Sequence, residues 1–247
     1  MNRFQRYAAY YMPDPAGEFW ALASSWLGRD AFTDRALDRP VLPALEGLNL
    51  ERLTAGPRHY GFHATLKAPF EPAGIDAETS LLSAMEAVAY AHAPFTVHLE
   101  VAPIGEFMAL RLAEEAPAMD ALHEDCVRQL DTLRAPLSEA DLARRRQARL
   151  TPLQDLYLVE WGYPYIFQQF RFHMTLTSRI ASYSAKETIR EALTDLFVPI
   201  TSLPHRVEGV ALFGQIDRQA PFQVIDWFAL RGKASTGLHD PGSVSTA

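Results

Sequence analysis

The chain has 247 residues, of which 48% are hydrophobic and 21% are charged, so it can bury a substantial core and is not disordered throughout. Its formal net charge of −7 argues against a broad nucleic-acid or acidic-membrane surface, because such surfaces need net positive charge. Cys126 is the only cysteine, which excludes an internal disulfide. The sequence shows neither a signal peptide nor an apolar run of roughly 18 residues, so we expect a cytoplasmic protein that does not enter a membrane.

Hydrophobic periodicity and the positions of Pro and Gly predict alternating helices and strands along the chain. The first half is predicted to contain a strand at 4–12, a helix at 14–28, weak signals over 29–57, a strand at 58–70, a helix at 76–92 and strands at 95–101 and 107–112. The second half is predicted to contain helices at 116–133 and 138–150, a strand at 170–180, a helix at 185–197 and strands at 207–213 and 222–230.

The order helix, strand, strand follows each of two segments that contain a His-x-Thr motif, centred on His63 and His173. The similar spacing predicts an internal duplication, although a chance recurrence of this order is the alternative. We expect an α+β fold that is bilobal and pseudo-twofold, in which two antiparallel sheets line a central cleft and helices pack outside. Residues 1–232 would form this single domain of two intertwined lobes. Residues 233–247, rich in Ser, Thr and Gly, would form a flexible tail.

The two motif segments alternate between polar and apolar positions, as expected of strands with one face in the core. One face of the first segment is polar or bare and consists of His59, Gly61, His63, Thr65 and Lys67. The corresponding face of the second consists of Arg171, His173, Thr175, Thr177 and Arg179. A strand that serves stability alone has little reason to collect imidazole, hydroxyl and cationic groups on one side, so we expect these faces to carry the chemistry.

Paired imidazoles suit the cleavage of a phosphodiester, which needs a base for the attacking oxygen and an acid for the leaving oxygen. Imidazole serves both tasks near neutral pH because its unperturbed pKa is about 6.5. His63 and His173 are therefore the predicted catalytic residues, and the pattern leaves open which is acid and which is base. The hydroxyls of Thr65 and Thr175 would donate hydrogen bonds to the non-bridging phosphate oxygens.

Other charged and aromatic residues could serve either the ligand or the structure. Lys67 and Arg171 would add positive charge around the phosphate. The alternative is that each is an exposed charge at the end of a strand. Tyr7 lies in an aromatic strand and fits a core position as well as a ligand contact. His59 is expected at the rim. The basic residues of one helix, Arg144, Arg145, Arg146 and Arg149, are expected to form a solvated helix face.

No metal site and no cofactor are predicted. The spacing of His59 and His63 suits zinc on a helix, whereas the alternation favours a strand, and no Cys pair or His-Glu-x-x-His motif is present. A Gly-rich phosphate loop is also absent from the sequence.

The segments YGFHATLK (residues 60–67) and FRFHMTLT (residues 170–177) resemble the two motifs of the two-histidine (2H) phosphoesterase superfamily. Within this superfamily the two segments, the opening RYA at residues 6–8 and WGYPY at residues 161–165 resemble a bacterial branch associated with phosphonate-degradation operons. The similarity spans most of residues 3–231. It implies motif strands that face each other in a bilobal fold.

The resemblance to the superfamily implies metal-independent cleavage of cyclic phosphates or 2′,5′ phosphodiesters, and the branch implies phosphoribosyl 1,2-cyclic phosphate as substrate. The expected partner is thus a small phosphorylated metabolite and not extended nucleic acid. Two alternatives stay open: a phosphodiesterase or ligase for RNA with 2′,3′-cyclic or 2′,5′ linkages, and a non-catalytic protein that binds a phosphometabolite. The sequence makes no prediction of the oligomeric state.

Overall fold

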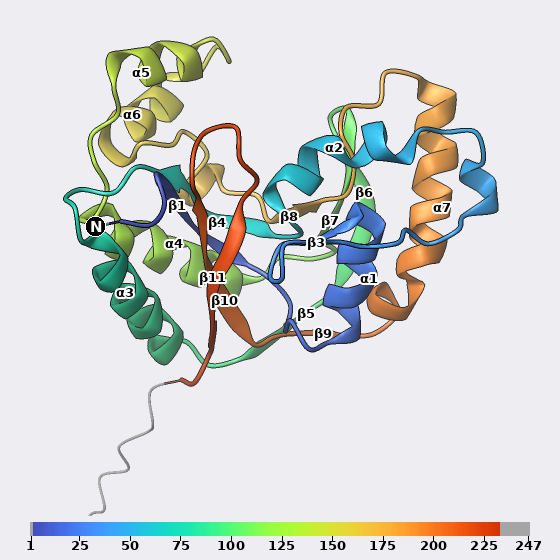
Figure 1. Ribbon diagram of the computed structural model, residues 1–247, viewed down its shortest axis with the longest axis horizontal. Coiled ribbons are helices and arrows are strands. Elements are labelled where there is room, and N and C mark those ends of the chain that lie inside the picture. The colour runs from blue at the N-terminus through green and yellow to red at the C-terminus, as the bar shows by residue number, and fades with distance from the viewer. Residues whose placement is uncertain (1, 233–247) are drawn as a thin grey trace, which may run out of the picture.

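The computed structural model of the chain describes residues 2–232 and confirms the predicted α+β class (Figure 1). Its main sheet has seven strands in the order β11-β10-β1-β4-β8-β7-β6, and every neighbouring pair is antiparallel. The strands are β1 (Arg6–Tyr11), β4 (Ala64–Phe70), β6 (Leu99–Ile104), β7 (Phe107–Leu112), β8 (His173–Thr175), β10 (Gly209–Gln215) and β11 (Gln223–Ala229). Two small sheets pair β2 (Arg29–Asp30) with β3 (Arg35–Ala36), and β5 (Phe95–Val97) with β9 (His205–Val207). The predicted tail, 233–247, lies outside the described residues.

Helices pack against the sheet and extend beyond one end of it. They are α1 (Glu18–Leu27), α2 (Leu50–Tyr60), α3 (Ala77–Ala91), α4 (Pro117–Asp131), α5 (Glu139–Arg146), α6 (Pro152–Trp161) and α7 (Tyr183–Thr201), with short 3₁₀ helices η1 (Pro43–Leu45) and η2 (Phe167–Gln169). Helix α3 packs against β10 and β11, α4 against β4, and α7 against β6. Figure 1 shows α5 and α6 together at one end of the molecule. None of the helices in the described part is long and apolar enough to cross a membrane.

The predicted repeat is present in both halves of the chain. Strand β4 is followed by α3, β5, β6 and β7, and β8 is followed by α7, β9, β10 and β11. The halves exchange strands, because β7 from the first repeat pairs with β8, while β10 from the second pairs with β1 beside β4. The two sheets that we expected to be separate are joined into one by the pairing of Ala64 with Met174.

The first motif strand begins later than predicted. Residues 58–60 form the last turn of α2, a helix that the weak signals of this region did not reveal. The Asn49 side chain caps its first turn by accepting a hydrogen bond of 2.8 Å from the Arg52 N–H. Gly61 ends it with φ of 79°. His59 therefore lies on a helix and not on the polar face of the strand.

The second motif strand is also shorter than predicted, since it covers His173–Thr175 alone. Helix α6, which precedes it, was not predicted, although its sequence contains a capping box formed by Thr151 and Gln154. The alternation within both motifs holds: Ala64, Leu66 and Met174 are fully buried in the core.

We predict that Gly61→Ala destabilises the fold more than Gly74→Ala. Both glycines have positive φ, a conformation that costs other residues roughly 1–2 kcal/mol. A Cβ on Gly61 would lie 2.4 Å from the Cβ of Ala31, whereas one on Gly74 meets nothing within 4 Å. Urea unfolding measures the loss of unfolding free energy in each variant. The additional substitution Ala31→Gly should narrow the difference between the two variants, and equal losses in the single variants would contradict the steric argument.

Candidate active site

The pairing of β4 with β8 brings the two His-x-Thr motifs together. Ala64 lies opposite Met174 in an antiparallel register, so one step to either side places His63 opposite Thr175 and Thr65 opposite His173. These four side chains share the face opposite to the core. Each histidine thus has the threonine of the other motif as its cross-strand neighbour, and the two histidines form a diagonal pair, for which Cβ atoms are typically about 7 Å apart.

Both imidazoles are oriented by the same local hydrogen bond. His63 Nδ1 lies 2.9 Å from the Gly61 carbonyl oxygen, and His173 Nδ1 lies 2.7 Å from that of Arg171. Because a carbonyl oxygen accepts and does not donate, Nδ1 carries a proton in each ring. Nε2 is left for chemistry, and the Thr65 hydroxyl lies 3.4 Å from Nε2 of His63.

Two adjoining hollows lie over the motif strands. The larger, about 500 Å³, is lined in part by His63, Thr65 and Thr175. The smaller, about 320 Å³, is lined in part by His173 and also contacts Thr65. Tyr163 borders both hollows, as Thr65 does. The four predicted motif residues therefore gather where the hollows meet, in a space of the size that holds a small ligand.

His63 is held as a neutral imidazole. Burial lowers the pKa of His63 to about 4, although its hydrogen bond to the Gly61 carbonyl opposes this shift, and the charge of His173 lowers the pKa further. The ring stacks on Tyr10 of β1 with a centroid distance of 3.8 Å. At neutral pH the ring therefore presents an unprotonated Nε2 to the cavity in a fixed orientation.

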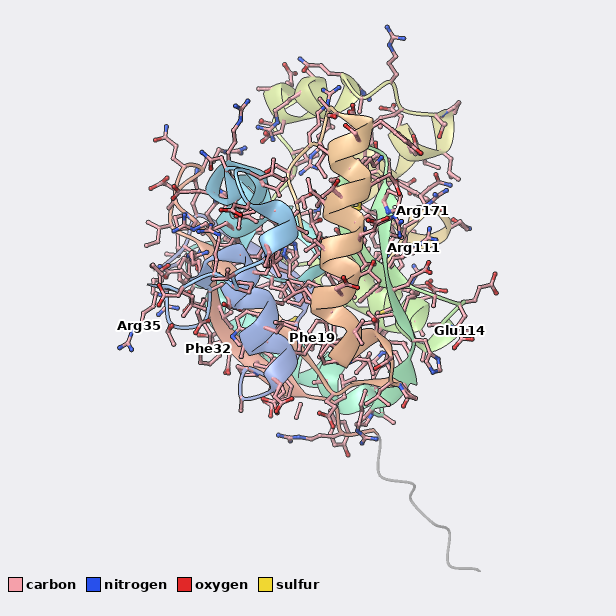
Figure 2. All side chains as sticks on the ribbon, turned by 90° about the vertical axis from the view of Figure 1, so that its right-hand side faces the viewer. Phe19, Phe32, Arg35, Arg111, Glu114 and Arg171 are labelled. Carbon is pink, nitrogen blue, oxygen red and sulfur yellow. The ribbon has the colours of Figure 1, made fainter. Side chains whose placement is uncertain are left out.

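The second motif lies nearer the outside. Arg171 is exposed and lines the smaller hollow with His173. Arg111 of β7 is the register partner of His173 and forms an ion pair of 2.6 Å with Glu100. Figure 2 labels Arg171 and Arg111 on the face of the molecule that this view presents. Two cationic side chains, those of Arg111 and Arg171, therefore lie near His173.

His123 of α4 links the two motif segments from the helix side of the sheet. Its Nδ1 donates to the Leu66 carbonyl at 2.8 Å, and its Nε2 accepts from the Phe167 N–H at 3.1 Å. The ring stacks on Phe170, shortly before the second motif, at 3.8 Å. Burial lowers the pKa of His123 to about 4, which keeps Nε2 free to accept.

The structure corrects the predicted placement of Lys67. A bulge between β1 and β4 shifts the register after Thr65, and the side chain of Lys67 turns to the helix side. Its ammonium group donates to the Val127 carbonyl at 3.0 Å and to Asp131 at 2.9 Å, in a buried position on α4. Lys67 therefore does not line either hollow, and Ala68 takes its place.

Tyr7 lies in the core and does not contact the ligand cavity. Its side chain is fully buried, and its hydroxyl donates to Glu78 at 2.7 Å. Of the two interpretations that the sequence left open, the structure supports the core position. His59 approaches Gln215 and is not among the residues that line the larger hollow.

Several residues of the larger hollow were not predicted from sequence. They are Tyr10, Tyr60, Tyr163 and four arginines, Arg6, Arg144, Arg145 and Arg218. The expectation of a solvated helix face holds for Arg144, whose side chain is exposed although it borders the cavity, and is wrong for Arg145, which is partly buried there. The segment WGYPY, which resembles the bacterial branch but carries no catalytic pattern of its own, supplies Tyr163. Among residues 2–232 no group of three His, Cys, Asp or Glu side chains could hold a metal ion.

We predict a structural role for the ion pair of Lys67. Asp131→Ala would leave the buried ammonium with a carbonyl as its acceptor, and breaking such a pair typically costs about 3–5 kcal/mol. Chemical unfolding should show this loss. Glu124→Ala on the same helix, which breaks an exposed pair with Arg128, is the control and should cost about 1 kcal/mol or less. A loss for Asp131→Ala no larger than that of the control would contradict the assignment.

We also predict that stability falls with acidification partly through His123. Its pKa of about 4 lies below the ordinary value of 6.5, so the unfolded chain binds more protons between these values. The contribution is complete above about pH 6.5 and is lost progressively as the pH falls from 6.5 to about 4. His123→Gln should flatten the dependence of unfolding free energy on pH by up to about 1.4 kcal/mol per pH unit. An unchanged slope between about pH 4.5 and 6.5 would contradict this prediction.

Comparison with known proteins places this chain in a family. The model of a family described as "Protein of unknown function (DUF1045)" matches residues 65–223. The chain is 35% identical over 226 residues to the ribose 1,5-bisphosphate phosphokinase PhnN of Janthinobacterium sp. (strain Marseille), covering 90% of this chain and 49% of that protein. It is 34% identical over 234 residues to the protein of the same name from Laribacter hongkongensis (strain HLHK9), covering 93% and 53%. The chain spans about half the length of these curated relatives.

Solved structures with a similar arrangement have low sequence identity. TT0787 of Thermus thermophilus is 17% identical, covers 93% of this chain and 100% of its own, and has a TM-score of 0.47. E. coli LigT complexed with 3′-AMP is 12% identical, covers 92% and 98%, and has a TM-score of 0.48. The two His-x-Thr motifs on paired strands of one antiparallel sheet agree with the resemblance to the 2H phosphoesterase superfamily. The chain belongs to the DUF1045 family.

Proposed function

We propose that the chain is a metal-independent phosphodiesterase that hydrolyses a small cyclic phosphate, with phosphoribosyl 1,2-cyclic phosphate as the substrate. The observation that carries this proposal is the register of β4 and β8, which sets His63 and His173 diagonally across a pair of threonine hydroxyls. Acid and base on opposite sides of one phosphorus are what in-line displacement needs.

The electrostatics supports an assignment of roles. His63 is the general base, because its depressed pKa keeps Nε2 unprotonated at neutral pH. Nε2 of His63 takes a proton from water as the water oxygen bonds to phosphorus. The bond from phosphorus to the leaving oxygen breaks, and that oxygen takes a proton from Nε2 of His173. The hydroxyls of Thr65 and Thr175 donate to the non-bridging oxygens, where negative charge grows.

The curated relatives support the identity of the substrate. Their name describes a kinase that acts on ribose 1,5-bisphosphate, and each is about twice as long as the segment that matches this chain. Water attack on a 5-phosphorylated ribose 1,2-cyclic phosphate, with cleavage of the bond between phosphorus and O2, yields ribose 1,5-bisphosphate. The product of this chain would then be the substrate of such a kinase. We accordingly propose that the ring opens at O2, with the phosphate retained on O1.

We predict that turnover of phosphoribosyl 1,2-cyclic phosphate persists in EDTA and gives ribose 1,5-bisphosphate, identified by ³¹P NMR. His63→Ala and His173→Ala should each lower kcat by about 10²–10⁴-fold, the usual contribution of one positioned acid or base. His98→Ala is the control, because His98 is exposed and pairs with Glu114 away from both hollows.

Full activity in His63→Ala would refute the proposed mechanism. Preferential cleavage of an oligonucleotide with a 2′,3′-cyclic end would refute the proposed substrate and leave the proposed mechanism standing. Absence of turnover across a panel of cyclic phosphates would instead support a non-catalytic protein that binds a phosphometabolite.

A further inference from the structure

Four arginines gather in the larger hollow beyond the His-x-Thr motifs. Arg6 comes from β1, Arg144 and Arg145 from α5, and Arg218 from the loop between β10 and β11. In Figure 1 this loop extends toward the end of the molecule where α5 and α6 lie. No Asp or Glu is among the described residues that line the hollow. Four guanidinium groups thus line one cavity of a chain whose net charge is −7.

Three of these arginines are held in place by partners around the cavity. Arg144 pairs with Asp141 at 2.6 Å. Arg218 pairs with Asp141 at 3.0 Å and with Glu71 at 2.9 Å. Arg6 donates to the side-chain oxygen of Gln215. Asp141 therefore ties α5 to the β10–β11 loop, which fixes the positions of two guanidinium groups.

Arg145 differs from the other three. Within residues 2–232 its side chain has no hydrogen bond and no ion pair, and its Nε is buried without a partner. Its guanidinium lies over the ring of Tyr163, 5.3 Å from the centroid, and Tyr163 borders both hollows. Arg145 lines the larger hollow, and its guanidinium donors have no partner among residues 2–232, so an anion in that hollow could accept hydrogen bonds from them.

We propose that these arginines form a second anion subsite, which binds a phosphate monoester carried by the same molecule whose cyclic phosphate lies at His63 and His173. Arginine presents a planar fork of donors that matches phosphate oxygens in pairs. A hollow of about 500 Å³ that contains His63 and Arg145 has room for a sugar with phosphate groups at both ends. The position of the cyclic phosphate rests on the proposed function, whereas the arginine cluster does not.

The subsite makes the enzyme selective for a sugar cyclic phosphate that carries a further phosphate group. A substrate without that group leaves Arg145 unpaired and loses its charge-assisted hydrogen bonds. Burial and the neighbouring charge of Arg144 lower the pKa of Arg145, and a bound dianion offsets both effects.

The test compares phosphoribosyl 1,2-cyclic phosphate with ribose 1,2-cyclic phosphate, which lacks the 5-phosphate. Arg145→Gln should lower kcat/KM for the first by about 10- to 100-fold, the usual loss for hydrogen bonds to a charged group. The value for the second should change less than about threefold. Arg145→Lys keeps the charge without the fork and should fall between Arg145→Gln and the wild type. Similar losses for both substrates would overturn the proposal.

Arg146→Gln is the matched control. Arg146 neighbours Arg145 on α5 but pairs with Asp155 and does not line the hollow. This variant should match the wild type with both substrates. A loss equal to that of Arg145→Gln would mean that α5 acts through its fold or its general charge, and would overturn the subsite.

A binding measurement separates this proposal from the proposed catalysis. Ribose 5-phosphate, titrated calorimetrically into the full chain, should bind the wild type and His63→Ala alike and bind Arg145→Gln at least about tenfold more weakly. If no cyclic phosphate is hydrolysed but this dependence holds, the catalytic proposal fails and the subsite stands. Equal binding to the wild type and Arg145→Gln overturns the subsite whatever the catalysis.

Discussion

The register between β4 and β8 is the constraint on which both the core and the candidate site depend. Because side chains alternate along a strand, the pairing of Ala64 with Met174 sends the apolar residues of both motifs inward and their polar residues to the other face. A slip of one residue would turn His63 into the core and expose apolar side chains to solvent. The packing that stabilises the sheet therefore also fixes the geometry of the two imidazoles. Local hydrogen bonds to the carbonyl oxygens of Gly61 and Arg171 then set the orientation of each imidazole ring.

Much of the fold could be predicted because its signals are local. The order of helices and strands after each motif follows from hydrophobic period and from Pro and Gly, and it recurs in the structure. The start of the first motif strand could not be found this way, because alternation across residues 58–63 conceals the last turn of α2. The joining of two expected sheets into one was also beyond the sequence. It rests on the pairing of Ala64 with Met174, two residues that lie far apart in the sequence, and no local pattern predicts such a pairing.

The candidate site likewise contains residues that the sequence predicts and residues that it does not. His63, Thr65, His173 and Thr175 were predictable because their chemistry and period are visible in each motif. Lys67 was misplaced because a bulge after Thr65 reverses the side-chain direction, and a bulge leaves no clear mark in one sequence. The arginines of α5 were assigned to solvent because tertiary contacts alone, above all those of Asp141 with Arg218, bring that helix to the cavity. The aromatic residue Tyr10 joins the site through strand pairing and stacking on His63.

The most direct test of the central claim is ¹⁵N NMR of the imidazole nitrogens during titration with inorganic phosphate. Two rings facing one phosphorus, each with Nδ1 donating to a backbone carbonyl, should show Nε2 resonances of His63 and His173 that shift together along one binding curve. Nδ1 of both rings should stay protonated throughout. A response from one ring alone, or two curves with different midpoints, would contradict the convergence of the two motifs on a single phosphate.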